Sequence, residues 1–112
     1  MPHSGPPVYE IKATVFRVLG HPARVRILEL LREGERSVGA LQAELQLDSG
    51  GTSQHLAALR RIGLVTARRE GTSVFYSVSD DRVFDLLAAG RDIITRRLAS
   101  EQSLLHELET EA

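Results

Sequence analysis

The spacing of apolar residues along the chain predicts a series of helices followed by two strands. Apolar residues recur at every third or fourth position, as on one face of an α-helix, in four segments: 8–19, 22–31, 38–45 and 53–62. Gly20, Gly34 and Gly63 follow such segments, where glycine commonly ends a helix. Beyond Gly63 the pattern changes to alternation, in "LVTARRE" and "SVFYSVS". We therefore expect a mainly α fold with one small β-hairpin.

Local capping signals indicate where the helices begin. Pro22 suits the first turn of the second helix, because its missing N–H would be unpaired there anyway, and His21 is interpreted as a helix-start residue. Ser37 is a good N-cap for the third helix, and Asp48 or Ser49 for the fourth. Only a few residues join these two helices, so they must cross steeply. This layout is that of a helix-turn-helix.

The alternating segment predicts a hairpin that follows the helix-turn-helix. Gly71 and Thr72 separate its two runs, as in a tight turn. Alternation places Val74, Tyr76 and Val78 on one face of the second strand. The predicted fold is a winged helix-turn-helix. It consists of two helices, a helix-turn-helix, a two-stranded wing and a terminal helix, which is described next.

Residues 82 to about 110 read as one long helix whose apolar seam is too long for a domain of this size to bury alone. The seam is interrupted by Glu101 and consists of Val83, Leu87, Gly90, Ile94, Leu98, Leu105 and Leu108. We expect this helix and the first helix to pack against a second copy of the chain. The alternative is a helix folded across its own domain. Residues 1–7 are expected to form a flexible arm, and residues 8–112 the winged helix-turn-helix domain.

The amino-acid composition excludes several kinds of functional site. The 112 residues include no cysteine, which excludes disulfides, thiolate metal sites and cysteine nucleophiles. The four histidines are widely spread, no carboxylate pair marks a pocket and no glycine-rich phosphate loop follows a strand, so we do not expect an enzyme. No apolar run approaches the roughly 18 residues that span a bilayer, and no signal pattern opens the chain. We therefore expect a cytoplasmic protein.

The net charge of −1 conceals a polarised distribution. Residues 49–72 carry four arginines against Glu70 alone, a balance of +3, whereas residues 80–112 carry eight acids against four arginines, a balance of −4. A basic middle segment with an acidic remainder indicates a surface that binds a polyanion.

Polar residues of the second helix, Arg24 among them, are expected to face solvent.

Three stretches of the chain resemble the ArsR/SmtB family of bacterial metal-responsive and related transcriptional repressors: "LGHPARVRILELL" at 19–31, "SQHLAALRRIGLV" at 53–65 and "RREGTSVFYSV" at 68–78. The resemblance covers about residues 10–90, and the combination is strongly specific. It implies a homodimeric repressor that binds a partly palindromic operator in double-stranded DNA. The fourth helix would lie in the major groove and the wing on the flanking backbone or minor groove.

The residues that open the fourth helix are candidates for contact with base edges: Thr52, Ser53, Gln54 and His55. Gln54 suits a bidentate contact with adenine, and the methyl group of Thr52 suits a contact with thymine. Two alternatives stay open, Ser53 as a cap of the turn and His55 as a residue partly buried behind the helix.

Four arginines are candidates for contact with phosphates: Arg60 and Arg61 at the end of the fourth helix, and Arg68 and Arg69 on the wing. If all four engage in both protomers, eight phosphates are neutralised. The slope of log K against log salt then approaches about −7 as an upper bound. The alternative is an ordinary solvated face.

Two adjacent glycines, Gly50 and Gly51, are expected in the first turn of the fourth helix, where each costs roughly 0.5–1 kcal/mol relative to alanine. Our hypothesis is that this turn is loose in the free protein and orders on DNA, so that backbone N–H groups approach a phosphate. The alternative is a longer loop.

A metal sensor would need a site without thiolates. One frequent site of the family joins an Asp-x-His pair on the terminal helix of one protomer to a His-x-x-Glu pair on the other. His106 and Glu109 match the second pair. Ile93 and Thr95 stand where the first pair is expected, and Asp92 is one residue out of register.

Half a metal site of this kind needs further ligands. His3 from the arm, or Glu107, would complete a weak nitrogen and oxygen site for nickel, zinc or cobalt. The alternative is that His106 and its acidic neighbours are solvated helix-end residues. Control by a partner protein, or no sensor at all, also stays open, as does a winged-helix module that binds proteins instead of DNA.

Overall fold

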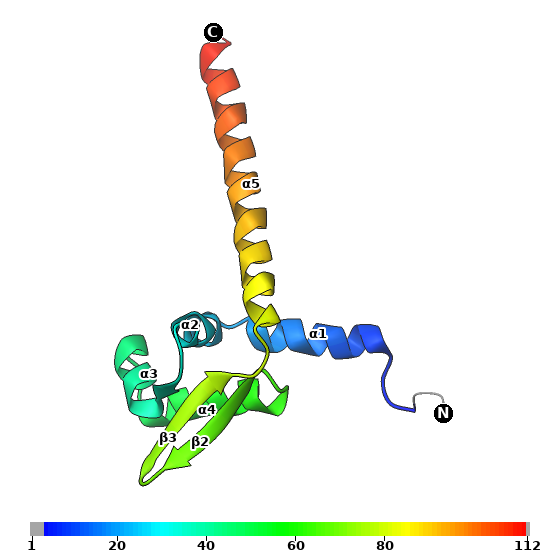
Figure 1. Ribbon diagram of the computed structural model, residues 1–112. Helices are drawn as coiled ribbons and strands as arrows, with labels where there is room; N and C mark the ends of the chain where they lie inside the picture. Colours follow the sequence, from blue (N-terminus) through cyan, green and yellow to red (C-terminus); the bar gives the residue numbers. More distant parts are fainter. Residues whose placement is uncertain (1–3, 112) are drawn as a thin grey trace. The chain divides into compact units, whose positions relative to one another are not determined.

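The computed structural model describes residues 4–111, apart from the side chain of Ser49, and the chain divides into two units, one ending at Asp81 and one starting at Arg82 (Figure 1). The first unit contains α1 (Val8–Leu19), α2 (Pro22–Leu31), β1 (Arg36–Ser37), α3 (Val38–Leu45), α4 (Ser49–Arg61), β2 (Val65–Glu70) and β3 (Ser73–Val78). The second unit is the single helix α5 (Arg82–Thr110). This element order confirms the predicted mainly helical winged helix-turn-helix.

The core of the first unit is built by α2, α3, α4 and β2. Its fully buried apolar side chains are Ile27, Leu28, Leu41, Leu56, Leu59 and Val65. The helical period gathers the apolar residues of α4 on one face, and α4 packs against β2 (Figure 1). Burial of one such side chain contributes about 1.5–3 kcal/mol, so Leu56 and Leu59 fix which side of α4 faces outward.

The wing contains three strands instead of the predicted two. The strand order is β1-β3-β2, and both pairs are antiparallel. Strand β1 has only two residues, and its second residue, Ser37, is also the N-cap of α3, since its Oγ accepts a hydrogen bond from the Ala40 N–H at 3.1 Å. A strand this short leaves no alternating pattern in the sequence.

Alternation along the strands gives the wing two different faces. The register pairs Arg68 with Phe75 and Arg69 with Val74. Arg69 and Val74 share the face of Val65, which is buried toward the core. Arg68 and Phe75 lie on the opposite face. The two adjacent wing arginines therefore point to opposite sides of the sheet.

Helix α5 is 29 residues long and buries little of its own surface. Every residue from 91 to 111 is exposed. The exposed large apolar side chains of α5 are Leu86, Ile93, Ile94, Leu98, Leu104, Leu105 and Leu108. Across residues 4–111, neither this helix nor any other is long and apolar enough to cross a membrane.

Candidate nucleic-acid interface

A short turn between α3 and α4 determines which residues open α4. Gln46 takes the left-handed conformation, with φ of 55°, and ends α3. Asp48 then caps α4, because its Oδ1 accepts a hydrogen bond from the Gly51 N–H at 2.7 Å. Of the two predicted caps, Asp48 is the one in place. The residues that follow this cap are the start of the predicted recognition helix.

Ser53 and Gln54 are the exposed residues among the predicted base contacts. Ser53 lines a groove of about 410 Å³ that lies between the start of α3 and the tip of the wing. The other lining residues are Ser37, Val38, Gly39, Thr72, Ser73 and Val74. Small and hydroxylated side chains thus surround Ser53, and no bulky group covers it. Both side chains are therefore exposed to solvent.

Thr52 corrects the sequence interpretation. Its side chain is completely buried, with 0% relative exposure. Its hydroxyl donates a hydrogen bond to the backbone oxygen of Asp48 at 3.0 Å, next to the bond from its own N–H at 3.1 Å. These two bonds hold the first turn of α4 together on its buried side. The geometry is incompatible with the predicted contact between the Thr52 methyl group and thymine.

His55 is half-buried, as the alternative interpretation anticipates, and it joins α4 to α2. Its Nδ1 accepts a hydrogen bond from Arg24 Nε at 3.2 Å, and its ring centre lies 4.3 Å from that of His21. Burial lowers the pKa of His55, and the charges of His21 and Arg24 lower it further. A neutral ring with Nδ1 as acceptor fits this arrangement. His55 therefore anchors α4 from behind.

His21 confirms the prediction of a helix-start residue. It is the N-cap of α2, and its Nδ1 accepts a hydrogen bond from the Ala23 N–H at 3.1 Å. Arg24, three residues later, departs from its prediction. It is half-buried instead of facing solvent, and besides bonding His55 it donates a hydrogen bond from Nη1 to the backbone oxygen of Val18 at 3.2 Å. Arg24 thus ties α1, α2 and α4 together.

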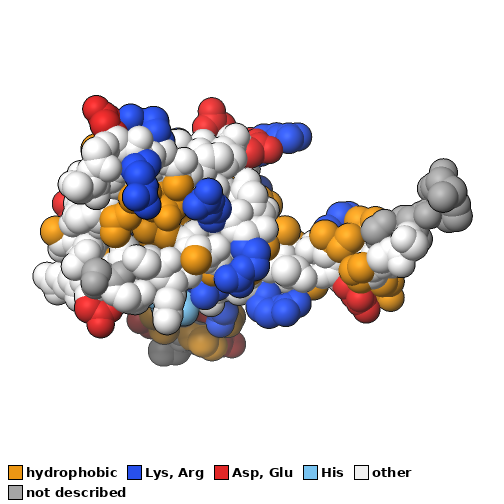
Figure 2. Space-filling model, turned by 90° about the horizontal axis from the view of Figure 1, so that it is seen from below, with side chains coloured by type: hydrophobic (Ala, Val, Ile, Leu, Met, Phe, Trp, Pro, Cys, Tyr) orange, Lys and Arg blue, Asp and Glu red, His pale blue; other side chains and the backbone are white. Residues whose placement is uncertain are grey.

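Three of the four predicted phosphate ligands are exposed and unpaired. Arg60 and Arg61 lie in the last turn of α4, and Arg69 lies on the wing. Within residues 4–111, none of the three guanidinium groups forms a hydrogen bond or an ion pair. Figure 2 shows the side that faces down in Figure 1, where Lys and Arg side chains spread around an apolar patch.

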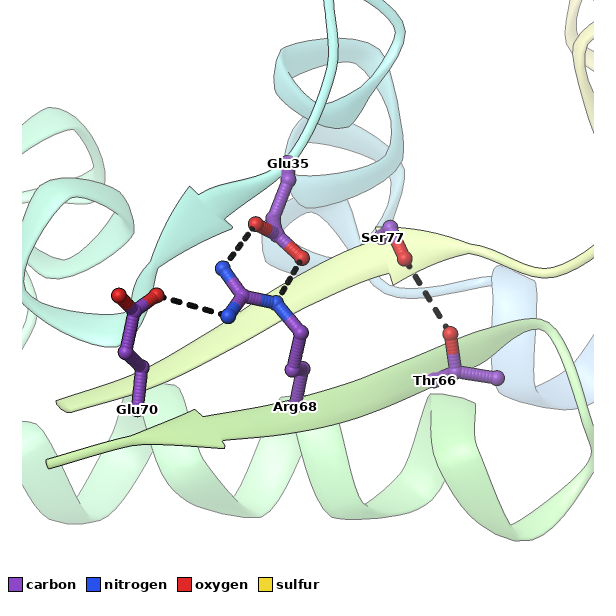
Figure 3. A network of polar contacts seen from close by, with 5 residues as sticks. All are labelled: Glu35, Thr66, Arg68, Glu70 and Ser77. Carbon is purple, nitrogen blue, oxygen red and sulfur yellow. Dashed lines mark hydrogen bonds and ion pairs between the residues drawn. The ribbon is translucent and has the colours of Figure 1, made fainter.

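Arg68, the fourth predicted phosphate ligand, is already occupied. Its guanidinium donates two hydrogen bonds to Glu35, at 3.1 and 2.7 Å, and one to Glu70 at 2.7 Å (Figure 3). These bonds raise the pKa of Arg68 and lower that of Glu35. The prediction that Arg68 binds a phosphate does not fit this geometry, because the guanidinium is already engaged and a phosphate would have to displace a carboxylate.

The two glycines of the opening turn lie within α4, and the turn is formed and capped. A Cβ atom added at Gly51 would lie 3.0 Å from Asp48 Oδ1, closer than side chains normally approach, whereas one at Gly50 would lie 3.8 Å away. The absence of a side chain at Gly51 therefore makes room for the capping carboxylate. The Gly51 N–H is engaged by Asp48 and is not available to a phosphate in this conformation.

The predicted metal ligands do not converge within one chain. Asp92 and His106 are fourteen residues apart on α5, which corresponds to about 21 Å along the helix axis. His106 and Glu109 are one turn apart and both exposed. His3 lies outside the described residues. Between residues 4 and 111, no cluster of three His, Asp or Glu side chains is suited to hold a metal ion.

The sequence interpretation missed Glu35 as the partner of Arg68, and it missed Arg24 as the partner of His55. Glu35 lies in the segment after α2, where no regular pattern draws attention to it. No sequence signal marks Glu35, because its place beside Arg68 depends on the pairing of β1, a strand too short to show alternation. No signal marks the role of Arg24 either, since its partner His55 is 31 residues away.

Comparison with known proteins agrees with this geometry. The model of bacterial regulatory proteins of the arsR family matches residues 21–67. The chain is 45% identical over 103 residues to the uncharacterized HTH-type transcriptional regulator Rv0081 of Mycobacterium tuberculosis, covering 91% of this chain and 90% of that protein. It is 38% identical over 87 residues to the biofilm growth-associated repressor of Agrobacterium fabrum, covering 74% of each.

Solved structures share the fold. The crystal structure of Rv0081 matches with a TM-score of 0.78 and 45% identity, over 87% of this chain and 98% of that chain. The solution structure of the homodimeric winged helix-turn-helix DNA-binding domain Mb0332 of Mycobacterium bovis matches with a TM-score of 0.72 and 32% identity, over 86% and 94%. The chain therefore belongs to the ArsR family of DNA-binding transcriptional regulators, and it is not an enzyme.

Proposed function

We propose that two copies of this chain form a homodimer that represses transcription by binding a partly palindromic operator. Each α4 enters the major groove of one half-site, with Ser53 and Gln54 against base edges. Arg60, Arg61 and Arg69 reach the flanking phosphates. The observation that carries this proposal is that these five side chains are exposed on α4 and the wing, while Thr52, Leu56 and Leu59 of α4 are buried in the core.

Apolar surface on α1 and on α5 supports the homodimer. The large apolar side chains left exposed are Val8, Tyr9, Ile11 and Phe16 on α1, and Leu86, Ile93, Ile94, Leu98, Leu104, Leu105 and Leu108 on α5. A groove of about 600 Å³ also lies along α1. Apolar surface of this extent marks an interaction site. We assign it to a second copy of the chain, because the similar domain from M. bovis is homodimeric.

Titration of DNA tests the operator proposal. The purified chain is titrated with the DNA upstream of its own gene and with an unrelated fragment of equal length, at physiological salt. Sequence-specific regulators of this kind bind their sites about a thousandfold or more tighter than other DNA. A footprint with two half-sites one helical turn apart is the expected pattern. Equal affinity for both fragments would overturn the proposal.

A charge placed in the apolar seam of α5 tests the homodimer. We expect light scattering to give a dimer for the wild type and a loss of dimer for Leu98→Lys, because a lysine would be buried in the interface. Ser103→Lys is the matched control, since Ser103 lies roughly 140° around the helix from Leu98. A monomeric wild type, or a dimer that tolerates Leu98→Lys, would contradict this arrangement.

The pair His106 and Glu109 supports a separate proposal about control. One nitrogen and one oxygen ligand a turn apart make half of a site, which ligands from a second chain must complete. Nickel, zinc and cobalt are titrated into the protein–operator complex. Release of DNA by one of them, abolished by His106→Ala, supports a metal sensor. No response to any of the three favours control by a partner protein or constitutive binding.

A further inference from the structure

Ser37, Phe75 and Arg68 lie in a row across the three strands of the wing. The register pairs Phe75 of β3 with Arg68 of β2 on one side and with Ser37 of β1 on the other. Glu35 stands two residues before Ser37, so its side chain is on the same face as Arg68. Figure 3 shows the carboxylate of Glu35 and the guanidinium of Arg68 pointing toward one another. The contact thus spans the whole width of the sheet.

All three nitrogen atoms of the Arg68 guanidinium are engaged. Nε and Nη2 donate to the two carboxylate oxygens of Glu35, and Nη1 donates to Glu70. The guanidinium carbon lies 5.0 Å from the ring centre of Phe75. Two parallel bonds between an arginine and one carboxylate fix the geometry of both side chains, unlike an ordinary surface ion pair. These contacts define a clamp formed by Glu35, Arg68 and Glu70.

The clamp does not present positive charge to a ligand. One guanidinium faces two carboxylates, so the three side chains together carry a charge of −1. A DNA phosphate that approached Arg68 would have to displace one carboxylate and would be repelled by the other. Ser77 and Thr66, next along the same face, are joined by a hydrogen bond of 3.2 Å between their hydroxyls.

The opposite face of the wing has the properties that a DNA contact needs. Arg69 lies there and is exposed and unpaired within residues 4–111. Its cross-strand partner is Val74, which lines the groove that also contains Ser53 of α4. Arg69 is therefore on the same side of the sheet as the exposed start of α4, and Arg68 is on the other side.

We propose that Arg68 is a positioning residue: held by Glu35 and Glu70, it fixes β2 to the segment before β1, holds the wing that carries Arg69 in one conformation, and contacts no phosphate itself. This inference rests on the proposed operator binding and specifies how the wing takes part in it. Loss of the clamp loosens the hairpin, but the pairing of β2 with β3 keeps Arg69 on the same face. Operator affinity then falls because the wing must be ordered on binding, while no phosphate ligand is lost and the salt slope stays the same.

The experiment compares Arg68→Ala, Glu35→Ala and the double variant with Arg69→Ala. Amide hydrogen exchange over residues 65–78 is measured in the free protein, and operator affinity is measured over a range of salt. Arg68→Ala and Glu35→Ala should each speed exchange in the wing and weaken binding by about two- to fivefold, and the double variant should be no weaker than either. Arg68→Ala and Glu35→Ala should both keep the wild-type slope of operator affinity against salt concentration.

Arg69→Ala is the matched control with the opposite signature. It should leave exchange in the wing unchanged and make the salt slope shallower by up to about 1.8 for the two protomers. Arg68→Lys adds a conservative variant, because lysine keeps the charge but cannot form the two-pronged bond. If the clamp is correct, Arg68→Lys should show faster amide exchange in the wing and weaker operator binding than the wild type. If Arg68 contacts a phosphate instead, the lysine should keep operator binding close to that of the wild type.

Two outcomes would overturn the clamp. A shallower salt slope in Arg68→Ala would show that Arg68 neutralises a phosphate. Tighter operator binding by Glu35→Ala would show that Glu35 holds a DNA ligand back, since its removal frees Arg68. A wild type that does not prefer its own upstream DNA overturns the proposed function instead, while the exchange measurements in the free protein still test the clamp.

Discussion

The end of α4 and the wing each carry two adjacent arginines, yet in the described part of the chain α4 leaves both of its arginines unpaired and the wing leaves one. Arg60 and Arg61 are exposed in the last turn of α4 without a polar partner within residues 4–111. In the wing, Arg69 has no polar partner among the described residues, whereas Arg68 is held by Glu35. The cause is geometric. Adjacent residues of a helix are about 100° apart and can serve one surface, whereas adjacent residues of a strand point to opposite faces.

This difference shows that a count of arginines overstates the charge that a surface offers to DNA. Eight arginines in a dimer would give a salt slope near −7. With Arg68 occupied in each protomer, six arginines of the dimer remain free to contact phosphates, and the upper bound on the salt slope falls to about −5.4. The salt slope of operator binding therefore distinguishes arginines that meet phosphates from arginines that hold the protein's own carboxylates.

Replacement of both helix arginines should have the largest effect on binding. Arg60→Ala/Arg61→Ala removes four phosphate contacts from a dimer, so the salt slope should become shallower by up to about 3.6. Operator affinity should fall on the order of a hundredfold or more at physiological salt. Fluorescence anisotropy with a labelled operator over a range of salt measures both quantities.

Folding of the double variant provides its control. Arg60 and Arg61 are exposed, so the thermal unfolding midpoint should stay close to that of the wild type. A well-folded variant with an unchanged slope would mean that these arginines form an ordinary solvated face. The difference in pairing between the arginines of α4 and those of the wing would then have no consequence for DNA binding.

The helices could be predicted from the sequence because burial of their apolar faces dominates the fold. Leu56 and Leu59, spaced by three residues, are fully buried as the helical period requires. The capping roles of His21 and Ser37 also follow from local chemistry and are confirmed. Strand β1 could not be predicted, because a two-residue strand has no period and depends on its pairing with β3.

The polar partners of the site could not be predicted, because they come from distant parts of the chain. Arg68 bonds Glu35 across 33 residues, and Arg24 bonds His55 across 31. Nothing in the local sequence around Arg68 or Arg24 marks these partners. Alternation along β2 would have placed Arg68 and Arg69 on opposite faces of the wing, but the sequence interpretation treats both as phosphate ligands.

Truncation of Gln54 should lower specificity and leave the salt dependence unchanged. A bidentate contact with a base is worth about 1–3 kcal/mol, so Gln54→Ala should weaken operator binding by about tenfold or more per half-site. Binding to unrelated DNA should not change, because that binding depends on the phosphates. Parallel titrations with both DNAs measure the ratio. Equal losses on both DNAs would show that Gln54 contacts the backbone.

The two glycines that open α4 should respond differently to alanine. Gly50→Ala should stabilise the protein by about 0.5–1 kcal/mol, because the helix gains a residue of better propensity and the nearest atom, Asp48 Oδ1, is 3.8 Å away. Gly51→Ala should gain less or lose stability, since its Cβ crowds the capping carboxylate at 3.0 Å. Urea denaturation measures both. Equal gains would mean that the cap contributes nothing.

Acid should loosen the attachment of α4 while leaving the wing clamp intact, which contrasts the two regions once more. Burial lowers the pKa of His55 below its usual 6.5, and that of Glu35 is lowered from 4.5 by its bonds to Arg68. Below pH 6.5 the unfolded chain binds a proton at His55 more readily than the folded chain does. The stability linked to His55 is therefore complete above pH 6.5 and is lost as the pH falls through its folded pKa.

The stability linked to Glu35 follows the same sign at lower pH, since it is present above pH 4.5 and lost only as the pH falls further. Denaturation of the wild type and of His55→Gln between pH 7.5 and 5.5 measures the first effect, and His106→Gln controls for the loss of a histidine elsewhere. His55→Gln should lose less stability over this range than the wild type. Amide exchange over residues 65–78, followed across the same range, should show no change linked to the clamp. A parallel decline of both variants and the wild type would mean that the contact between His55 and Arg24 does not hold α4 in place.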